Sequence, residues 1–156
     1  ISRFILLIYF HLMKLLRSGL KMTTMGTCLC GAIEVTSDEK PDQIIACYCE
    51  SCQKACGGGA SFNIIKTDEG ARLSKGETKI YNDTADSGNS LERHFCGMCG
   101  SPIFSVTTAY PGFKIWKAGL FSDIDGLEVI TNIWCDSAPS WSTINNSIPS
   151  HGKSRQ

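Results

Sequence analysis

The stretch Phe95-Cys96-Gly97-Met98-Cys99-Gly100 places two cysteines on a glycine-rich bend. Two similar clusters lie upstream, Cys28-Leu29-Cys30 and Cys47-Tyr48-Cys49-Glu50-Ser51-Cys52. Cysteines this close in sequence rarely reach disulfide geometry with each other, whereas their thiolates can converge on one zinc ion at about 2.3 Å. The seven clustered cysteines therefore predict two metal sites. Four thiolates would close one tetrahedron, and three would leave the other site open at its fourth position.

The total of nine cysteines in 156 residues also favours metal ligands over disulfides. This density is below that of small disulfide-rich secreted domains, and an odd number would leave one thiol over. We therefore expect a reducing compartment and a cytoplasmic protein. Two cysteines fall outside the clusters. Cys135 is predicted to be a buried apolar thiol, while Cys56, four residues after Cys52, is an ordinary thiol, an extra ligand or a resolving thiol.

Length and charge narrow the class of protein. A chain of 156 residues with 42% hydrophobic content can bury one core but hardly two. The formal net charge is zero and no basic stripe is present, so the sequence predicts no nucleic-acid partner. Clustered thiolates would still need cations nearby. Lys54 and Arg93 lie beside the clusters and are candidates, with a solvated surface role as the alternative for each.

The two ends of the chain differ from the rest. The apolar run Phe4–Leu16 is shorter than the roughly 20 residues that a membrane-spanning helix needs, so no membrane segment is predicted. A signal peptide is not favoured either, because no small-x-small cleavage site follows the run. We expect residues 1–24 to be an extension outside the domain, residues 25–142 to form the domain, and residues 143–156 to be a tail that is disordered from Ser147 onward.

From Gly26 onward the pattern is that of short strands separated by glycine-rich or polar turns, with no long amphipathic helix. The predicted fold is therefore mainly β. The candidate strands are Ile33–Val35, Ile44–Cys49, Ser61–Lys66, Lys79–Tyr81, Leu91–Phe95, Pro102–Val106, Phe113–Trp116 and Leu127–Trp134.

The clusters differ in their places on these strands. Cys28 and Cys30 precede a strand, and Cys96 and Cys99 follow one, each pair next to glycines that let both sulfurs face a metal. A metal shared by these two pairs would join distant parts of the chain, so we interpret it as structural. The middle cluster ends a strand and supplies three sulfurs, so we interpret it as reactive, with a position for water or a substrate thiol. Spacing alone leaves other pairings of the clusters open.

Three segments together resemble the glutathione-dependent formaldehyde-activating enzyme family, which also includes centromere protein V. They are Gly26-Thr27-Cys28-Leu29-Cys30-Gly31, Cys47-Tyr48-Cys49-Glu50-Ser51-Cys52-Gln53-Lys54 and Arg93-His94-Phe95-Cys96-Gly97-Met98-Cys99-Gly100-Ser101-Pro102. The resemblance covers roughly residues 25–142. It implies an Mss4-like fold of small antiparallel sheets organised around zinc, and a carbon–sulfur lyase or synthase-type activity. It also implies two zinc ions per chain: a structural one on Cys28, Cys30, Cys96 and Cys99, and a catalytic one on Cys47, Cys49 and Cys52.

The family reaction joins a thiol such as glutathione to formaldehyde and gives an S-hydroxymethyl adduct. A metal with an open position suits this chemistry, because a coordinated thiol loses its proton near neutral pH. With three thiolates the metal would be a weak Lewis acid, so we expect it to bind the thiolate more than to polarise the carbonyl. The implied partners are therefore a small aldehyde and a thiol such as glutathione, while the sequence leaves the oligomeric state open.

Two residues depart from the family pattern. Many members have His and Arg where this chain has Tyr48 and Gln53, which puts proton-shuttling or anion-binding roles at those places in doubt. With an ordinary pKa near 10, Tyr48 is a poor base at neutral pH, so packing is the expected role. His94 lies beside a cysteine pair, but strand alternation turns it to the face opposite Arg93, and we do not expect it to act as a base.

Two other classes of function remain open at this point. The first is a non-enzymatic zinc domain that binds a protein partner, although the chain lacks the long basic or proline-rich arm of a chromatin or microtubule binder. The second is a redox or metal-buffering thiol protein, for which Cys56 would be the supporting feature.

Overall fold

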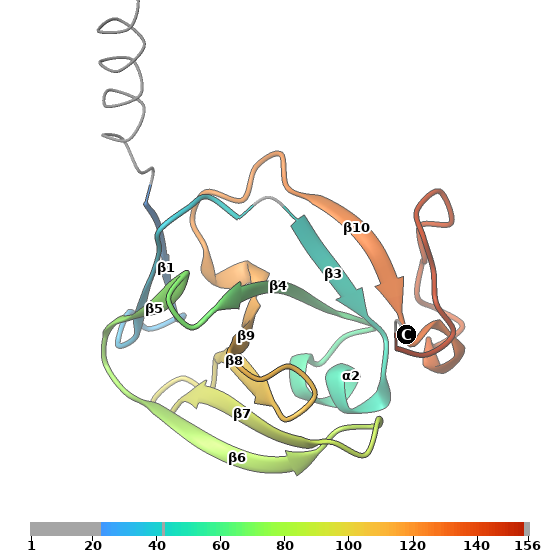
Figure 1. Cartoon of the computed structure of the whole chain (residues 1–156), viewed down its shortest axis with the longest axis horizontal. Helices are drawn as coiled ribbons and strands as arrows, with labels where there is room; N and C mark the ends of the chain where they lie inside the picture. The colour runs from blue at the N-terminus through green and yellow to red at the C-terminus, as the bar shows by residue number, and fades with distance from the viewer. Residues whose placement is uncertain (1–22, 42, 155–156) are drawn as a thin grey trace, which may run out of the picture.

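The computed structural model describes residues 23–41 and 43–154, and this part of the chain forms two β-sheets (Figure 1). The smaller sheet has three strands in the order β1-β2-β5, and the larger has seven in the order β10-β3-β4-β9-β8-β7-β6. The strands are β1 (Thr24–Thr27), β2 (Glu34–Ser37), β3 (Gln43–Cys47), β4 (Ser61–Thr67), β5 (Ala71–Lys75), β6 (Thr78–Thr84), β7 (Ser90–Cys96), β8 (Pro102–Thr107), β9 (Phe113–Lys117) and β10 (Glu128–Ile133). The mainly β fold is confirmed.

The strand prediction is confirmed in part. All eight predicted segments overlap observed strands, but β1 and β5 were not predicted. β1 has four residues and only one large apolar side chain, Met25. β5 does alternate apolar and polar residues, with Ala71 and Leu73 on one face, and this alternation was overlooked. The pairs are antiparallel except for β10 and β3, which run parallel. Parallel pairing needs a long connection, and most of the domain lies between these two strands in sequence.

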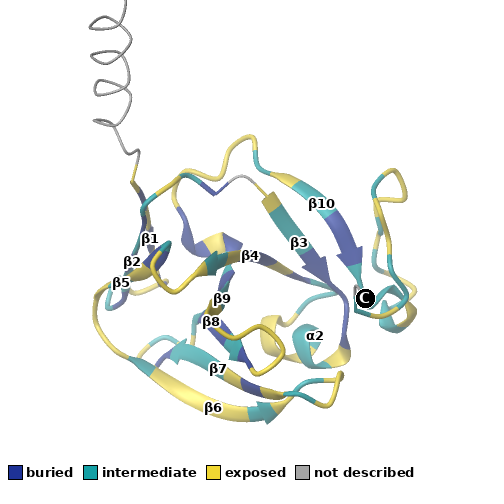
Figure 2. Ribbon diagram, viewed as in Figure 1, coloured by how far each residue is buried: buried dark blue, intermediate teal, exposed yellow. Residues whose placement is uncertain are grey.

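The two faces of the large sheet have different composition. On one face, Ile64, Trp116 and Phe104 stand in adjacent positions of β4, β9 and β8, and all three are buried in the hydrophobic core. On the other face, a row of paired residues crosses the same strands and β7: Ile65, Ile115, Ser105 and Arg93. On this face too, Lys117, two residues after Ile115 on β9, pairs with Asn63 on β4. The second face therefore carries polar and cationic side chains among apolar ones. By contrast, β6 at the edge of the sheet is mostly exposed (Figure 2).

A short helix, α2 (Glu50–Cys56), follows β3 and lies between the end of that strand and the tip of the β6–β7 hairpin (Figure 1). Cys49 caps its N-terminus, where its Sγ accepts a hydrogen bond from the Cys52 amide at 3.4 Å. Gly57 ends the helix with φ of 67°. The helix has seven residues and none of them is buried, so no apolar stripe marks it in the sequence.

The disordered tail predicted from Ser147 onward is wrong for the residues described through Ser154. The segment runs along β10 and exchanges backbone hydrogen bonds with it: the Asn132 amide donates to Pro149 O at 2.9 Å, and the His151 amide donates to Asn132 O at 2.9 Å. The buried Asn132 side chain also donates to Asn145 O and Ser150 Oγ. Polar composition predicted disorder, but these bonds satisfy the segment's backbone against the sheet.

The predicted N-terminal extension lies mostly outside the described residues, although Thr24, its last residue, begins β1. Over residues 23–41 and 43–154, no helix is long and apolar enough to cross a membrane.

Candidate metal centres and the thiol-lined cavity

Four of the clustered cysteines come together at the junction of the two sheets. The Sγ atoms of Cys28, Cys30, Cys96 and Cys99 all lie within 4.8 Å of one another. The Sγ atom of Cys30 is 3.6 Å from that of Cys28 and 3.8 Å from that of Cys96. Zinc–sulfur bonds of about 2.3 Å at tetrahedral angles place sulfurs about 3.8 Å apart, so this four-cysteine group fits one zinc ion.

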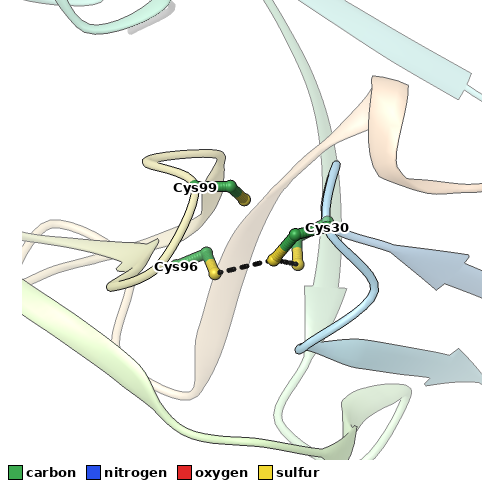
Figure 3. A group of neighbouring side chains, drawn as sticks. Cys30, Cys96 and Cys99 are labelled. Carbon is green, nitrogen blue, oxygen red and sulfur yellow. Dashed lines mark hydrogen bonds between the residues drawn. The ribbon is translucent and has the colours of Figure 1, made fainter.

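Two bends supply this four-cysteine group, one from the β1–β2 connection and one from the β7–β8 connection (Figure 3). Gly31 and Gly100 have φ of 73° and 74°, which lets each bend turn back after its second cysteine. Ser101 links the two bends: its hydroxyl lies 3.2 Å from Cys99 Sγ and accepts a hydrogen bond from the Leu29 amide at 3.1 Å. Hydrogen bonds with Ser101 also lower the pKa of Cys99 to about 5, which favours a thiolate ligand.

The middle cluster forms a second group. The Sγ atoms of Cys47, Cys49 and Cys52 lie within 4.8 Å of one another. Cys47 ends β3, Cys49 caps α2, and Cys52 lies on the first turn of that helix, so the strand-to-helix turn brings the three together. Among the described residues no other cysteine, histidine or carboxylate belongs to this three-cysteine group. It can therefore hold a metal with one position left for an outside ligand.

The thiols of the three-cysteine group cannot all ionise without a cation among them. Hydrogen bonds from Cys47 and Cys49, together with the charges of Lys117 and Arg93, hold the pKa of Cys52 far below its ordinary value. Hydrogen bonding to Cys49 and Cys52, with burial, raises the pKa of Cys47 far above it. Like charges this close oppose one another, so a bound cation is required for three thiolates to coexist.

The three-cysteine group opens onto two adjoining cavities. The first, called here the Lys117 cavity, has a volume of about 130 Å³. It is lined by Ile45, Cys47, Cys52, Asn63, Ile65, Leu91, Arg93, Ser105, Tyr110, Ile115, Lys117, Ile133 and Ser154. The second, the Asp86 cavity, has a volume of about 160 Å³ and shares Cys47, Cys52 and Arg93 with the first. Cys49, Ser51 and the 85–87 turn line only the second.

Two cations line the Lys117 cavity beside the cysteines. Lys117 Nζ donates to Asn63 Oδ1 at 2.8 Å and to Ser61 Oγ at 3.0 Å, both neutral acceptors. Burial lowers the pKa of Lys117, and the negative charges of Cys52 and Cys47 oppose that shift. Arg93 Nε donates to Asp83 Oδ2 at 2.8 Å, and its Nη2 is buried with no hydrogen-bond partner in the described part of the chain. The cavity thus has apolar walls and a cationic side.

The sequence named Arg93 but did not single out Lys117 as a cation of the site. Lys117 lies two residues after Ile115 on β9, so the two side chains share a face, and it stands opposite Asn63 on β4. Strand alternation could have placed Lys117 with Ile115 on one face, but only the register across the three strands β9, β8 and β7 shows that Arg93 shares that face. Lys54, the other predicted cation, is exposed, and its Nζ lies 3.7 Å from Glu50 Oε2 on the same helix. Of its two predicted roles, the solvated surface role is therefore the one observed.

The two residues that depart from the family pattern line neither cavity. Tyr48 is buried, which agrees with the expected packing role. The Gln53 side chain donates to Tyr48 O at 2.6 Å and to Ser137 O at 2.8 Å, so it ties α2 to neighbouring backbone. His94 stacks on Phe104 with ring centroids 4.1 Å apart and lies 2.8 Å from Thr78 Oγ1, on the core face of the sheet.

None of the nine cysteines forms a disulfide in the described part of the chain. The Cys56 thiol is exposed and donates to Ala60 O at 3.2 Å, and its sulfur belongs to neither metal group. Cys135 is partly exposed in a turn after β10, so the prediction of a buried apolar thiol is wrong there. The turn follows Trp134, whose left-handed backbone leads the chain out of the sheet.

Comparisons with known proteins agree with this arrangement. The sequence matches the family described as glutathione-dependent formaldehyde-activating enzyme over residues 23–137, which include both cysteine groups. A Halomonas elongata protein, provisionally named as such an enzyme, is 27% identical over 130 residues, covering 80% of this chain and 83% of that protein. An uncharacterized lyase of Schizosaccharomyces pombe is 25% identical over 114 residues, covering 73% of this chain and 80% of the relative.

The fold also has a counterpart among solved structures. A crystal structure of a Rhodobacter sphaeroides protein superposes with a TM-score of 0.52 at 18% identity, covering 65% of this chain and 90% of the other. At this identity the likeness concerns the fold.

Proposed function

Because the chain belongs to the glutathione-dependent formaldehyde-activating enzyme family, we propose that it is a zinc-dependent enzyme that makes and breaks the carbon–sulfur bond of S-hydroxymethyl thiols. The substrates are a thiol such as glutathione and a small aldehyde such as formaldehyde. The observation that carries the proposal is the three-cysteine group, which borders two cavities and has no fourth protein ligand among residues 23–41 and 43–154.

The residues present fit a zinc ion in both groups. All seven clustered cysteines are free, and in each group the sulfurs are close enough to share one ion. Cys28, Cys30, Cys96 and Cys99 would hold a structural zinc, and Cys47, Cys49 and Cys52 the reactive one. When bound, the reactive zinc supplies a site at which a substrate thiol loses its proton near neutral pH.

The chain's own residues shape the rest of the reaction. The thiol gives its proton to solvent, the thiolate attacks the aldehyde carbon to form the new S–C bond, and the carbonyl π pair moves to oxygen, which takes up a proton from solvent. In reverse, the S–C bond breaks, the hydroxyl proton returns to solvent and the thiol is released. Isoleucines and Tyr110 give the Lys117 cavity a largely apolar wall beside these groups. The cavity is small, about 130 Å³, so it suits a thiol sulfur with a one-carbon aldehyde, and most of glutathione must lie outside it.

The proposal is tested first by metal content and then by exchange. We expect about two zinc ions per purified chain. Formaldehyde and glutathione combine spontaneously, so exchange between free and adduct signals is followed by NMR with and without the zinc-loaded protein. Wild-type protein should accelerate exchange above background, and Cys49→Ser should abolish the acceleration while it loses about one zinc.

Cys56→Ser is the matched control, because Cys56 lies at the other end of the same helix but outside both metal groups. It should keep both zinc ions and the full acceleration. Zinc-loaded wild-type protein that gives no acceleration would contradict the proposed reaction. One zinc per chain with a disulfide among Cys47, Cys49 and Cys52 would instead favour a redox thiol protein.

A further inference from the structure

We propose that Lys117 and Arg93 form an anion-binding subsite in the Lys117 cavity, which holds the sulfur of the incoming thiol as a thiolate. This inference rests on the proposed function, since it names what selects the ligand at the open position. The two cations come from strands β9 and β7, on either side of β8, and both line the cavity that borders Cys47 and Cys52.

The first support is the charge of the cavity lining. In the part of the chain that is described, no aspartate or glutamate lines the Lys117 cavity, while Lys117 and Arg93 do. Lys117 hydrogen-bonds the neutral Ser61 and Asn63 and has no carboxylate partner among the described residues, so the negative charges that act on it are those of Cys52 and Cys47. An ammonium group kept from water without a carboxylate is costly, and a nearby anion offsets that cost.

The second support is the hydrogen-bonding capacity left over at Arg93. Its Nε is bonded to Asp83, which holds the guanidinium in place, while Nη2 is buried and meets no hydrogen-bond geometry in the described structure, with the Cys52 sulfur as the anionic group beside the guanidinium. Buried donors in folded proteins are nearly always paired, so Nη2, which interacts with Cys52 without good hydrogen-bond geometry, has capacity left for an acceptor supplied by a ligand in the cavity.

The third support is the charge change that binding would bring. A zinc ion with three thiolates carries one net negative charge, and a thiolate as fourth ligand would raise that to two. In an apolar cavity this second charge is expensive unless cations lie beside it. Lys117 and Arg93 meet that need, whereas a neutral ligand such as water gains little from them. The volume of about 130 Å³ suits a sulfur with its methylene group better than a bulky anion.

The test measures thiol binding to zinc-loaded protein by calorimetry, with three ligands and no turnover. Glutathione carries a thiol and carboxylates, 2-mercaptoethanol carries only the thiol, and S-methylglutathione carries only the carboxylates. Lys117→Gln removes the charge but can keep hydrogen bonds to Ser61 and Asn63. We expect at least about tenfold weaker binding of glutathione and of 2-mercaptoethanol, with the response to S-methylglutathione unchanged.

Two further variants keep the result decisive. Lys54→Gln removes an exposed cation on α2 and should bind all three ligands as wild type does. Arg93→Gln should weaken the binding of glutathione and of 2-mercaptoethanol in the same way. If Lys117→Gln does not retain two zinc ions, the subsite is tested with Arg93→Gln instead. Unchanged thiol affinity in a zinc-replete variant overturns the subsite, as does a loss shared by S-methylglutathione but absent for 2-mercaptoethanol. If zinc-loaded wild-type protein binds no thiol, the proposed function fails together with the subsite.

Discussion

At the scale of single residues, the bends that carry the cysteines depend on backbone freedom. Gly100 has φ of 74° directly after Cys99, and a Cβ there would meet no atom within 4 Å. A substitution is therefore opposed by conformation and not by a clash. Left-handed backbone costs an L-residue roughly 1–2 kcal/mol. The strain would fall on the bend that holds two ligands of the four-cysteine group.

Gly100→Ala should accordingly lower the free energy of unfolding of the zinc-loaded protein by about 1–2 kcal/mol, measured by urea denaturation. Gly119→Ala is the control, because a Cβ at Gly119 also meets nothing within 4 Å and its φ is not in the left-handed region. It should change stability by less than about 0.5 kcal/mol. Equal effects of the two substitutions would contradict the role assigned to the bend.

The sequence predicted the candidate metal-binding cysteines better than it predicted the residues around them. Cysteine spacing is a local property, so the three clusters could be named from the sequence, whereas the pairing of Cys28 and Cys30 with Cys96 and Cys99 came from the family resemblance. The position of Lys117 beside Arg93 depends on pairing between strands distant in sequence, which no local pattern determines. Tyr48 and Gln53 are the opposite case: the sequence drew attention to them, but neither lines a cavity. Tyr48 is buried, and the Gln53 side chain hydrogen-bonds the backbone.

At the scale of elements, the β6–β7 hairpin holds the first turn of α2. Asp86 at its tip accepts hydrogen bonds from the Glu50 amide at 3.1 Å and from Ser51 Oγ at 2.6 Å. The first amides of a helix lack partners within the helix, so this carboxylate completes the cap that begins at Cys49. The contact joins residues 36 apart, and for that reason neither it nor the short helix was predictable from local sequence.

Asp86→Asn should loosen α2 and therefore the three-cysteine group more than the four-cysteine group. We expect a loss of about 1 kcal/mol in the free energy of unfolding, and faster release of one of the two zinc ions to a chelator, followed with a colorimetric zinc indicator. Glu69→Gln, an exposed substitution in the β4–β5 turn, should leave both release rates unchanged. Equal acceleration of both zinc ions would show that Asp86 acts on the whole fold.

At the scale of the whole molecule, the four-cysteine group joins the two sheets. Cys28 and Cys30 lie between β1 and β2 of the smaller sheet, while Cys96 ends β7 of the larger sheet and Cys99 lies in the turn that leads to β8. The three-cysteine group, by contrast, lies within one strand-to-helix turn at the side of the larger sheet. We therefore expect that loss of the proposed metal from the four-cysteine group would separate the two sheets, whereas its loss from the three-cysteine group would leave the strand pairing intact.

Cys96→Ser and Cys49→Ser should therefore have different effects on thermal unfolding. Structural zinc in small domains supplies roughly 10–16 kcal/mol, which equals or exceeds the roughly 5–15 kcal/mol by which a whole domain is stable. Cys96→Ser should not retain a cooperative thermal transition, while Cys49→Ser should unfold cooperatively with about one zinc bound. Circular dichroism during heating, with zinc content measured on the same samples, checks both, and Cys135→Ser serves as a control outside either group. If Cys49→Ser unfolded and Cys96→Ser kept its transition, the structural and reactive roles would have to be exchanged between the two groups.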